Sequence, residues 1–243
     1  MAKNSKEPKA VFPEIIADYK QLFGEDLISI ILYGSATGHE FRPGKSDINF
    51  MIVLTERGID RLDRAFKIVG RWRKRNVAIP LFVTEGYVVA SLDVFPIEYL
   101  SIKLNHLLVY GKDILESLTF DQELIRLQCE REIKGKLLLL REAFLETSGK
   151  GRAMRGVISQ SVRALIAVFE ALLYLKGKEL PTEKRGLIRD TAEVFEMNAG
   201  VFEMLLDIKE GKIKLGDRET TKLFKDYLKE VRELSKLVDA LGG

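Results

Sequence analysis

Cysteine and histidine are scarce in this sequence of 243 residues. A single cysteine, Cys129, excludes an intrachain disulfide and any zinc site built from several thiolates. Two histidines, His39 and His106, are too few for most transition-metal sites. A chain that does not rely on disulfides suits a reducing compartment, so we expect it in the cytoplasm.

The sequence also lacks a strong charge imbalance and a long apolar run. Its 39 Lys and Arg residues against 36 Asp and Glu give a net charge of +3, too small to indicate a general nucleic-acid binder. Residues 1–10 are polar and lysine-rich, unlike a signal peptide. The apolar runs are shorter than the roughly 20 residues that span a bilayer, so no membrane partner is expected.

The first half of the chain mixes helix and strand patterns. Apolar residues at helical spacing predict a helix over residues 12–23, and a β-branched, aliphatic run predicts a strand over residues 27–33. Residues 47–54 predict a second strand. Further on, the patterns predict a helix over 60–74, a strand over 77–84, a short strand or a helix start over 88–92, and a helix over 96–109.

After about residue 119 no alternating stretch remains, and every pattern is helical. Helices are predicted over 121–147, with Asp121 as N-cap, and over 152–175, 182–197, 201–209 and 220–241. The sequence therefore predicts an α+β fold, with an α/β domain at residues 1–118 and a helical bundle domain at 119–243. The long amphipathic stripe of residues 220–241 could pair within the chain or between two chains, so a homodimer stays an open alternative.

Two short motifs carry the chemical information. The strand of residues 27–33 ends in Gly34 and Ser35, and a second strand opens on Ser46-Asp47-Ile48-Asn49 after a loop of about ten residues. Alternation along that strand places Asp47 and Asn49 on the same face. Two neighbouring oxygen-bearing side chains on a strand are an arrangement that can hold a metal ion.

These motifs resemble the nucleotidyltransferase superfamily, which has the DNA polymerase beta-like fold and the pattern hG-[GS]-x(9–13)-[DE]-h-[DE]. The resemblance extends to a subgroup of uncharacterised bacterial and archaeal nucleotidyltransferase-domain proteins with a C-terminal helical domain, through residues 95–99, 109–113 and 130–142. The resemblance implies a mixed sheet with flanking helices, which we expect on one side of the sheet.

The resemblance also implies a chemistry, the transfer of a nucleoside monophosphate from a triphosphate to a hydroxyl with Mg²⁺ as cofactor. Two metal ions can stabilise both the attacking and the leaving oxygen in such a displacement. Carried over by position, the expected nucleotide-binding residues are Gly34, Ser35, Ser46, Asp47 and Asn49. Asp47 matches the first metal-binding acid and is the candidate catalytic residue, whereas Asn49 stands where the second acid is usual.

The third acid of the family should lie on residues 77–84, which contain no carboxylate. Glu85 or Asp93 could replace it from a loop. Without such a replacement, Asp47 and Asn49 would hold at most one Mg²⁺. We therefore expect a degenerate site that binds a nucleoside triphosphate and transfers slowly or not at all.

Two other functions stay open at this point. One is an active Mg²⁺-dependent transferase acting on a small molecule, an RNA end or a protein hydroxyl, and the other is a non-catalytic interaction module. The acceptor and any protein partner are not identified by the sequence.

A few further residues have alternative interpretations. The basic run of residues 71–75 could contact nucleic acid through Trp72, but the positive end of a helix with a packed Trp72 is the favoured interpretation. Loop residues His39 and Lys45 could meet a phosphate, and Arg152, Arg155 and Arg163 could flank a nucleotide. His106 is expected to be structural. No histidine follows it, which excludes the arginine–histidine motif of small helical ribonuclease toxins.

Overall fold

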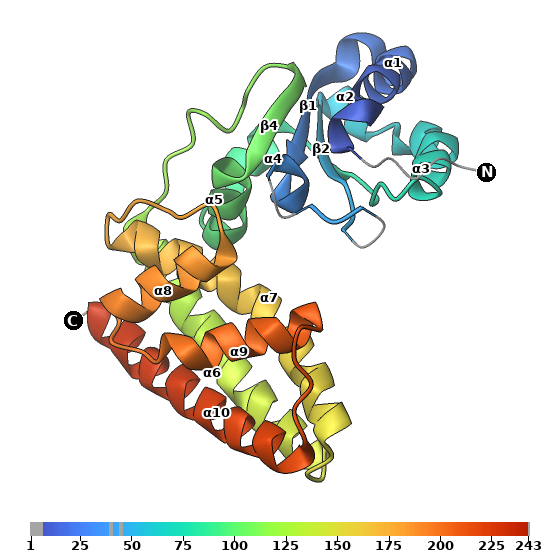
Figure 1. Ribbon diagram of the computed structural model, residues 1–243. Helices are drawn as coiled ribbons and strands as arrows, with labels where there is room; N and C mark the ends of the chain where they lie inside the picture. The colour runs from blue at the N-terminus through green and yellow to red at the C-terminus, as the bar shows by residue number, and fades with distance from the viewer. Residues whose placement is uncertain (1–6, 39–40, 44–45, 243) are drawn as a thin grey trace. The chain divides into compact units, whose positions relative to one another are not determined.

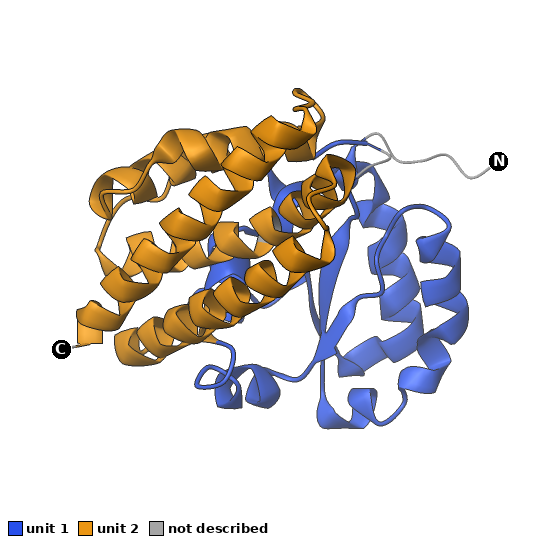
Figure 2. Ribbon diagram, turned by 90° about the horizontal axis from the view of Figure 1, so that it is seen from below, with its two compact units in different colours: residues 1–95, 99–120 blue, residues 96–98, 121–243 orange. Residues whose placement is uncertain are grey.

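The computed structural model describes residues 7–38, 41–43 and 46–242, except for the side chain of Arg163. The chain divides into two compact units, coloured separately in Figure 2. The first unit comprises Met1–Phe95 and Tyr99–Phe120, and the second comprises Pro96–Glu98 and Asp121–Gly243. Residues Pro96–Glu98, which are part of one helix, belong to the second unit. The chain therefore enters the second unit at Pro96, returns to the first at Tyr99 and enters the second again at Asp121.

The first unit is built on a four-stranded mixed sheet (Figure 1). Its strands are β1 (Leu27–Tyr33), β2 (Asn49–Leu54), β3 (Leu81–Val83) and β4 (His106–Gly111), in the order β3-β2-β1-β4. Strand β1 is antiparallel to both β2 and β4, whereas β3 is parallel to β2. This mixed sheet and the helices after it confirm the predicted α+β fold class.

Both faces of the sheet are covered. One apolar cluster joins alternate residues of β1 and β2, such as Ile30 and Phe50, to α1 (Phe12–Phe23) and α3 (Phe66–Arg73). A second cluster joins the opposite residues, such as Ile31 and Met51, to α4 (Glu85–Ala90) and α5 (Pro96–Leu104). The expectation of helices on one side is therefore wrong. Both alternating sets of β1 and β2 are apolar, and only burial on both faces removes both from water.

The boundaries of several predicted elements also differ. Residues 96–109 form α5 up to Leu104 and then β4, because a short apolar run such as Leu107–Leu108–Val109 fits a buried strand as well as a helix. The predicted helix of residues 60–74 is divided into the short 3-10 helix Leu62–Ala65 and α3, and a separate helix, α2 (Glu56–Ile59), precedes them. Residues 85–90 form α4, whose first turn is capped by the Thr84 hydroxyl. Further 3-10 turns span Pro8–Val11, Gly24–Asp26, Gly34–Thr37 and Ala240–Gly242.

In the described part of the second unit, all regular secondary structure is helical. Its helices are α6 (Gln122–Glu146), α7 (Gly151–Leu175), α8 (Lys184–Val194), α9 (Ala199–Glu210) and α10 (Asp217–Asp239). Each presents buried apolar residues to its neighbours, and α10, for example, buries Leu223, Tyr227 and Leu234. The five helices match the predicted sequence of amphipathic segments.

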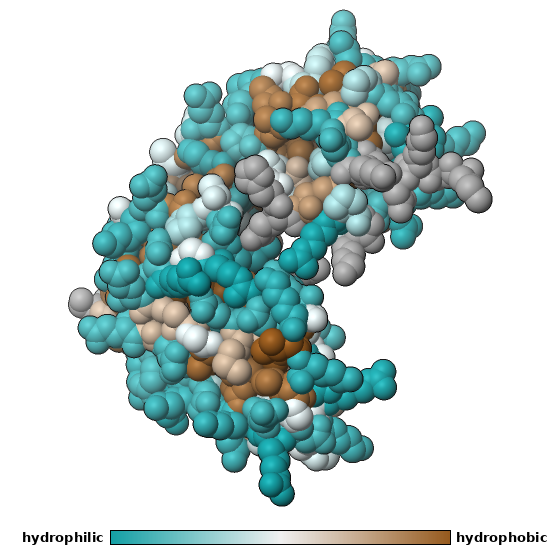
Figure 3. Space-filling view, in the orientation of Figure 1, coloured by the Kyte–Doolittle hydropathy of each residue, from teal (hydrophilic) through white to brown (hydrophobic). Residues whose placement is uncertain are grey.

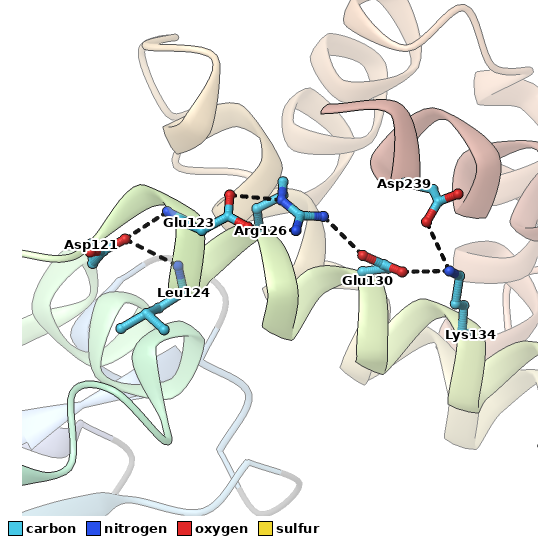
Figure 4. A network of polar contacts seen from close by, with 7 residues as sticks. All are labelled: Asp121, Glu123, Leu124, Arg126, Glu130, Lys134 and Asp239. Carbon is cyan, nitrogen blue, oxygen red and sulfur yellow. Dashed lines mark hydrogen bonds and ion pairs between the residues drawn. The ribbon is translucent and has the colours of Figure 1, made fainter. Parts of the chain in front are cut away.

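Charged side chains fix the start of α6 (Figure 4). Asp121 is the predicted N-cap, and its carboxylate accepts hydrogen bonds from the backbone N–H groups of Glu123 and Leu124. Arg126 joins Glu123 to Glu130, and Lys134 joins Glu130 to Asp239 at the end of α10. This network connects the two long helices along one side of the bundle.

Among the described residues, helix α7 is the one helix both long enough and apolar enough to cross a membrane. It packs against α6, α8, α9 and α10, and 53% of its most apolar window is buried inside the protein. The apolar residues of α7 are therefore accounted for by the bundle core. Hydrophilic residues cover most of the face drawn in Figure 3, with smaller apolar patches among them.

Candidate functional site

The turn after β1 is shaped by Gly34, which has a φ of 76°. Its backbone N–H donates to the carbonyl of Asn105 at 2.9 Å, and its carbonyl accepts from the Thr37 hydroxyl at 2.9 Å. The Gly34 amide is thus already paired within the protein and is not free to bind a phosphate. The half-buried Ser35 hydroxyl makes no hydrogen bond with a described residue, so Ser35 is the donor that the turn offers.

The sheet register brings this turn to the second motif. Tyr33 at the end of β1 is the direct partner of Asn49 at the start of β2. A side chain added at Gly34 would place its Cβ 3.8 Å from the amide nitrogen of Asn49. Asp47 is exposed two residues before Asn49, and it makes no ion pair with a described residue. Gly34, Ser35, Asp47 and Asn49 therefore gather at one edge of the sheet.

A corner between α3 and β3 holds the segment that carries Asp47. The side-chain amide of Asn76 donates to the Ser46 carbonyl at 2.7 Å, and the Ile48 N–H donates to the Asn76 carbonyl at 3.1 Å. The Ser46 hydroxyl accepts the backbone N–H of Arg42 at 3.1 Å and so closes the preceding loop. Asn76 has a positive φ of 67°, a conformation that asparagine tolerates better than most residues. Asn76 belongs to neither motif, so the sequence did not point to its role.

Two further side chains lie in the same row across the sheet. Tyr33 is the register partner of both Asn49 on β2 and His106 on β4. Partners in antiparallel strands point to the same face, so Asn49, Tyr33 and His106 are neighbours. Burial raises the pKa of Tyr33. This row depends on the β1–β4 register. The sequence did not predict that register, because residues 106–109 were predicted to be part of a helix and not a strand.

The His106 ring is held by Asp113, with 2.9 Å between Nε2 and Oδ2. Partial burial of the Asp113 carboxyl disfavours its charge, but hydrogen bonds from His106 and from backbone N–H groups outweigh this effect. The pKa of Asp113 therefore lies below its ordinary value.

The donor set at this edge fits one magnesium ion at most. Magnesium takes oxygen ligands and commonly uses one or two carboxylates together with substrate phosphates. Asp47 and the side-chain oxygen of Asn49 could supply two such ligands. Among the described residues, no group of three or more His, Cys, Asp or Glu side chains could hold a metal ion.

The structure also places Glu85 away from this edge. In the parallel β2–β3 pair, Val83 is the register partner of Val53. Val53 lies four residues after Asn49, which is about 13 Å along β2. Glu85 lies beyond Val83 in the chain and pairs with Lys112, with 2.6 Å between its Oε1 and the lysine Nζ. It therefore does not replace the missing third acid. Asp93 is exposed between α4 and α5 and belongs to no metal-binding group of described residues.

The basic run of residues 71–75 is occupied by structural contacts. Arg71 and the indole N–H of Trp72 both donate to Asp18, and Arg75 pairs with Glu14. Trp72 is only 1% exposed, so it offers no stacking surface for a base. This supports the helix-end interpretation of the cluster.

The remaining candidates belong to the second unit or lie outside the described residues. Arg155 donates to the Leu215 carbonyl at 2.6 Å and thereby holds the loop before α10, while Arg152 is exposed. His39 and Lys45 lie outside the described residues, as does the side chain of Arg163.

No protein-family model and no curated protein sequence matches the chain. Among solved structures, it is similar to the spectinomycin adenyltransferase AAD(9) from Enterococcus faecialis, determined with ATP and spectinomycin. The TM-score is 0.51 at 13% sequence identity, over 90% of this chain and 99% of that chain. Similarity at this level of identity concerns the fold. The chain has a nucleotidyltransferase-like α+β fold with a helical C-terminal part, as the two motifs predicted.

Proposed function

We propose that this protein binds a nucleoside triphosphate at the edge formed by Gly34, Ser35, Ser46, Asp47 and Asn49, and that it transfers a nucleotide slowly or not at all. The observation that carries the proposal is the Tyr33–Asn49 register, which sets the Gly-Ser turn beside the Asp47 strand within a nucleotidyltransferase-like fold. The family motif also sets a Gly-Ser turn beside an acidic strand. The segments at residues 95–99 and 109–113 favour the subgroup of nucleotidyltransferase-domain proteins with a C-terminal helical domain.

Each residue has a defined part in this proposal. The Ser35 hydroxyl donates to a phosphate oxygen, while Gly34 and Asn105 keep the turn in place. Asp47 and Asn49 would hold a single Mg²⁺ that neutralises phosphate charge. One carboxylate cannot readily hold two divalent cations. The negative charges of a second and a third acid, which would compensate the charge of the two cations, are missing. Slow or absent transfer is the consequence.

An active transferase is the second candidate, and one observation favours it. The solved neighbour was determined with ATP and a small-molecule acceptor, spectinomycin. If this protein is active, a hydroxylated small molecule is the acceptor class to examine first.

Thermal unfolding with each nucleoside triphosphate, with and without Mg²⁺, tests the binding proposal. Ligand at about 100 times its dissociation constant should add roughly 2.7 kcal/mol to the free energy of unfolding. For a chain of this size, that corresponds to a midpoint rise of about 5–10 °C. We expect the rise to depend on Mg²⁺ and to disappear in Asp47→Ala.

A matched control separates this effect from general destabilisation. Asp63→Ala removes an equally exposed aspartate of the first unit, outside the site, and should keep the full rise. Absence of a shift in the wild-type protein with every nucleotide at millimolar concentration would contradict the proposal and favour an interaction module.

A further inference from the structure

His106 begins β4 at the same edge as the Gly34 turn, and both of its ring nitrogens face acceptors. Nδ1 lies 2.6 Å from the Lys103 carbonyl, and Nε2 lies 2.9 Å from the Asp113 carboxylate. A neutral imidazole has one N–H and can satisfy only one of these acceptors, whereas the imidazolium satisfies both. The His106 ring therefore bridges the end of α5 and the Asp113 carboxylate.

The surroundings of His106 tie two segments together. The other oxygen of Asp113 accepts the Leu115 N–H at 2.9 Å. From α5, the Lys103 ammonium donates to the carbonyls of Glu116 and Leu118 at 2.9 and 2.7 Å. The side chains of Lys103 and Asp113 thus join the end of α5 and the start of β4 to residues 113–118.

Asn105 lies directly between this cluster and the turn. Its backbone N–H donates to the carbonyls of Ser101 and Ile102, so the end of α5 fixes it from one side. His106 fixes it from the other side, since the two residues share a peptide bond. The Asn105 carbonyl then accepts the Gly34 N–H at 2.9 Å. The position of the turn therefore depends on the segment that His106 anchors.

We propose that His106, held between the Lys103 carbonyl and the Asp113 carboxylate, is a positioning residue for the Gly34–Ser35 turn and thereby sets nucleotide affinity. This inference rests on the proposed function, because the turn is the phosphate-binding element of that proposal. Replacement of the His106 ring leaves the Asp113 carboxylate without its donor, and replacement of the Asp113 carboxylate leaves the His106 ring without its acceptor. The Asn105 carbonyl then loses its fixed position, and the Ser35 hydroxyl loses its alignment.

Hydrogen exchange of the Gly34 amide tests the positioning directly, without any nucleotide. In His106→Gln and in Asp113→Asn, we expect the Gly34 protection factor to fall by about tenfold while that of the central β1 residue Ile30 changes much less.

Nucleotide affinity of the same variants tests the consequence. Each single substitution should weaken binding about three- to tenfold, and the double variant should be no weaker than the worse single one, because both remove the same interaction. Asp26→Asn is the matched control, since it breaks a comparable ion pair with Arg57 at the opposite end of β1. It should lower the thermal midpoint and leave affinity within about twofold.

The outcomes separate this inference from the proposed function. Selective loss of Gly34 protection together with weaker binding supports the positioning role. Gly34 protection that is unchanged, or that falls only in parallel with Ile30 as in the control, overturns it. If the wild type binds no nucleotide, the proposed function fails, and Gly34 exchange still decides whether His106 positions the turn.

Discussion

At the scale of single residues, charge at Asp47 and Asn49 decides what the site can do. Asn49 begins β2 beside the Gly34 turn, and Asp47 stands two residues before it. An asparagine oxygen can still ligate Mg²⁺, but it brings no negative charge. For the proposed function, the pair therefore lacks the charge that would hold a second divalent cation.

Restoring the carboxylate gives the sharpest test of this view. Asn49→Asp should tighten Mg²⁺-dependent nucleotide binding by about tenfold or more, corresponding to about 1.4 kcal/mol. Pyrophosphate release should rise as well, because the added charge helps to hold the metal against the phosphates. Isothermal titration and a pyrophosphate assay measure the two effects. Asn49→Ala serves as the control and should gain neither; a loss of activity in Asn49→Asp would instead indicate a working site specialised for asparagine.

Asp26 gives a pH-dependent prediction at the other end of β1. Its carboxylate accepts hydrogen bonds from the Thr55 hydroxyl at 2.6 Å and from Arg57 at 2.8 Å, which hold the pKa of Asp26 below its ordinary value. A carboxyl group with a lowered folded-state pKa stabilises the protein above its unfolded pKa of about 3.9, and this contribution is lost as the pH falls through the folded-state pKa. Asp26→Asn should therefore be less stable than the wild type at pH 7, and the difference should vanish toward pH 2.

Urea unfolding at several pH values checks this prediction. The result that would contradict it is an equal difference between the two proteins at pH 7 and at pH 2. Such a result would mean that Asp26 acts through packing and not through its charge.

At the scale of elements, β4 is fixed by a close backbone contact. Gly111 has a φ of 84°, and a Cβ at this position would lie 1.9 Å from the Ile28 carbonyl oxygen on β1. Any side chain there must displace backbone, so the pairing of β4 with β1 requires glycine at position 111.

Gly111→Ala should lower the free energy of unfolding by about 2–5 kcal/mol, because strain at positive φ adds to the steric overlap. The matched variant is Gly70→Ala, at an exposed position within α3 where an added Cβ meets nothing within 4 Å. It should raise stability by about 0.5–1 kcal/mol through helix propensity. Chemical denaturation compares the two, and equal effects would show that the Gly111 contact is not rigid.

Predictions from sequence at this scale succeeded where one periodicity extended over a whole element. The helix of residues 12–23 and the strand of residues 27–33 have the predicted bounds. Residues 96–109 failed because two elements meet there without a proline or glycine between them, and the leucine-rich start of β4 continues the apolar pattern of α5. The β1–β4 register, and with it the row of Asn49, Tyr33 and His106, could not be inferred without that strand.

At the scale of the whole molecule, the chain contains two compact units, and the two apolar clusters on the faces of the sheet both belong to the first. The single tryptophan, Trp72, is buried in the first unit, whereas the five long helices from α6 onward belong to the second. Tryptophan fluorescence therefore reports on the first unit, and far-ultraviolet circular dichroism reports mainly on the second.

If the predicted division near residue 118 marks two independently stable domains, the two signals should unfold at different urea concentrations. Gly111→Ala should shift the fluorescence transition, and Leu234→Ala, which removes a fully buried side chain of α10, should shift the dichroism transition by about 2–5 kcal/mol. Coincident transitions that move together in both variants would show a single cooperative unit.

Residue patterns alone predict the fold class, the order of most elements and the placing of Gly34, Ser35, Asp47 and Asn49 close together. These features are local, since periodicity and short motifs depend on residues close together in the chain. The folded structure was needed to show that both sheet faces are covered, that Glu85 lies away from Asn49, that His106 lies in one row with Tyr33 and Asn49, and that Asn76 holds Ser46. Those results depend on strand register and on contacts between distant segments, such as Gly34 with Asn105 and Ser46 with Asn76. Such contacts leave no periodic signal, because each is a single pairing between residues far apart in sequence.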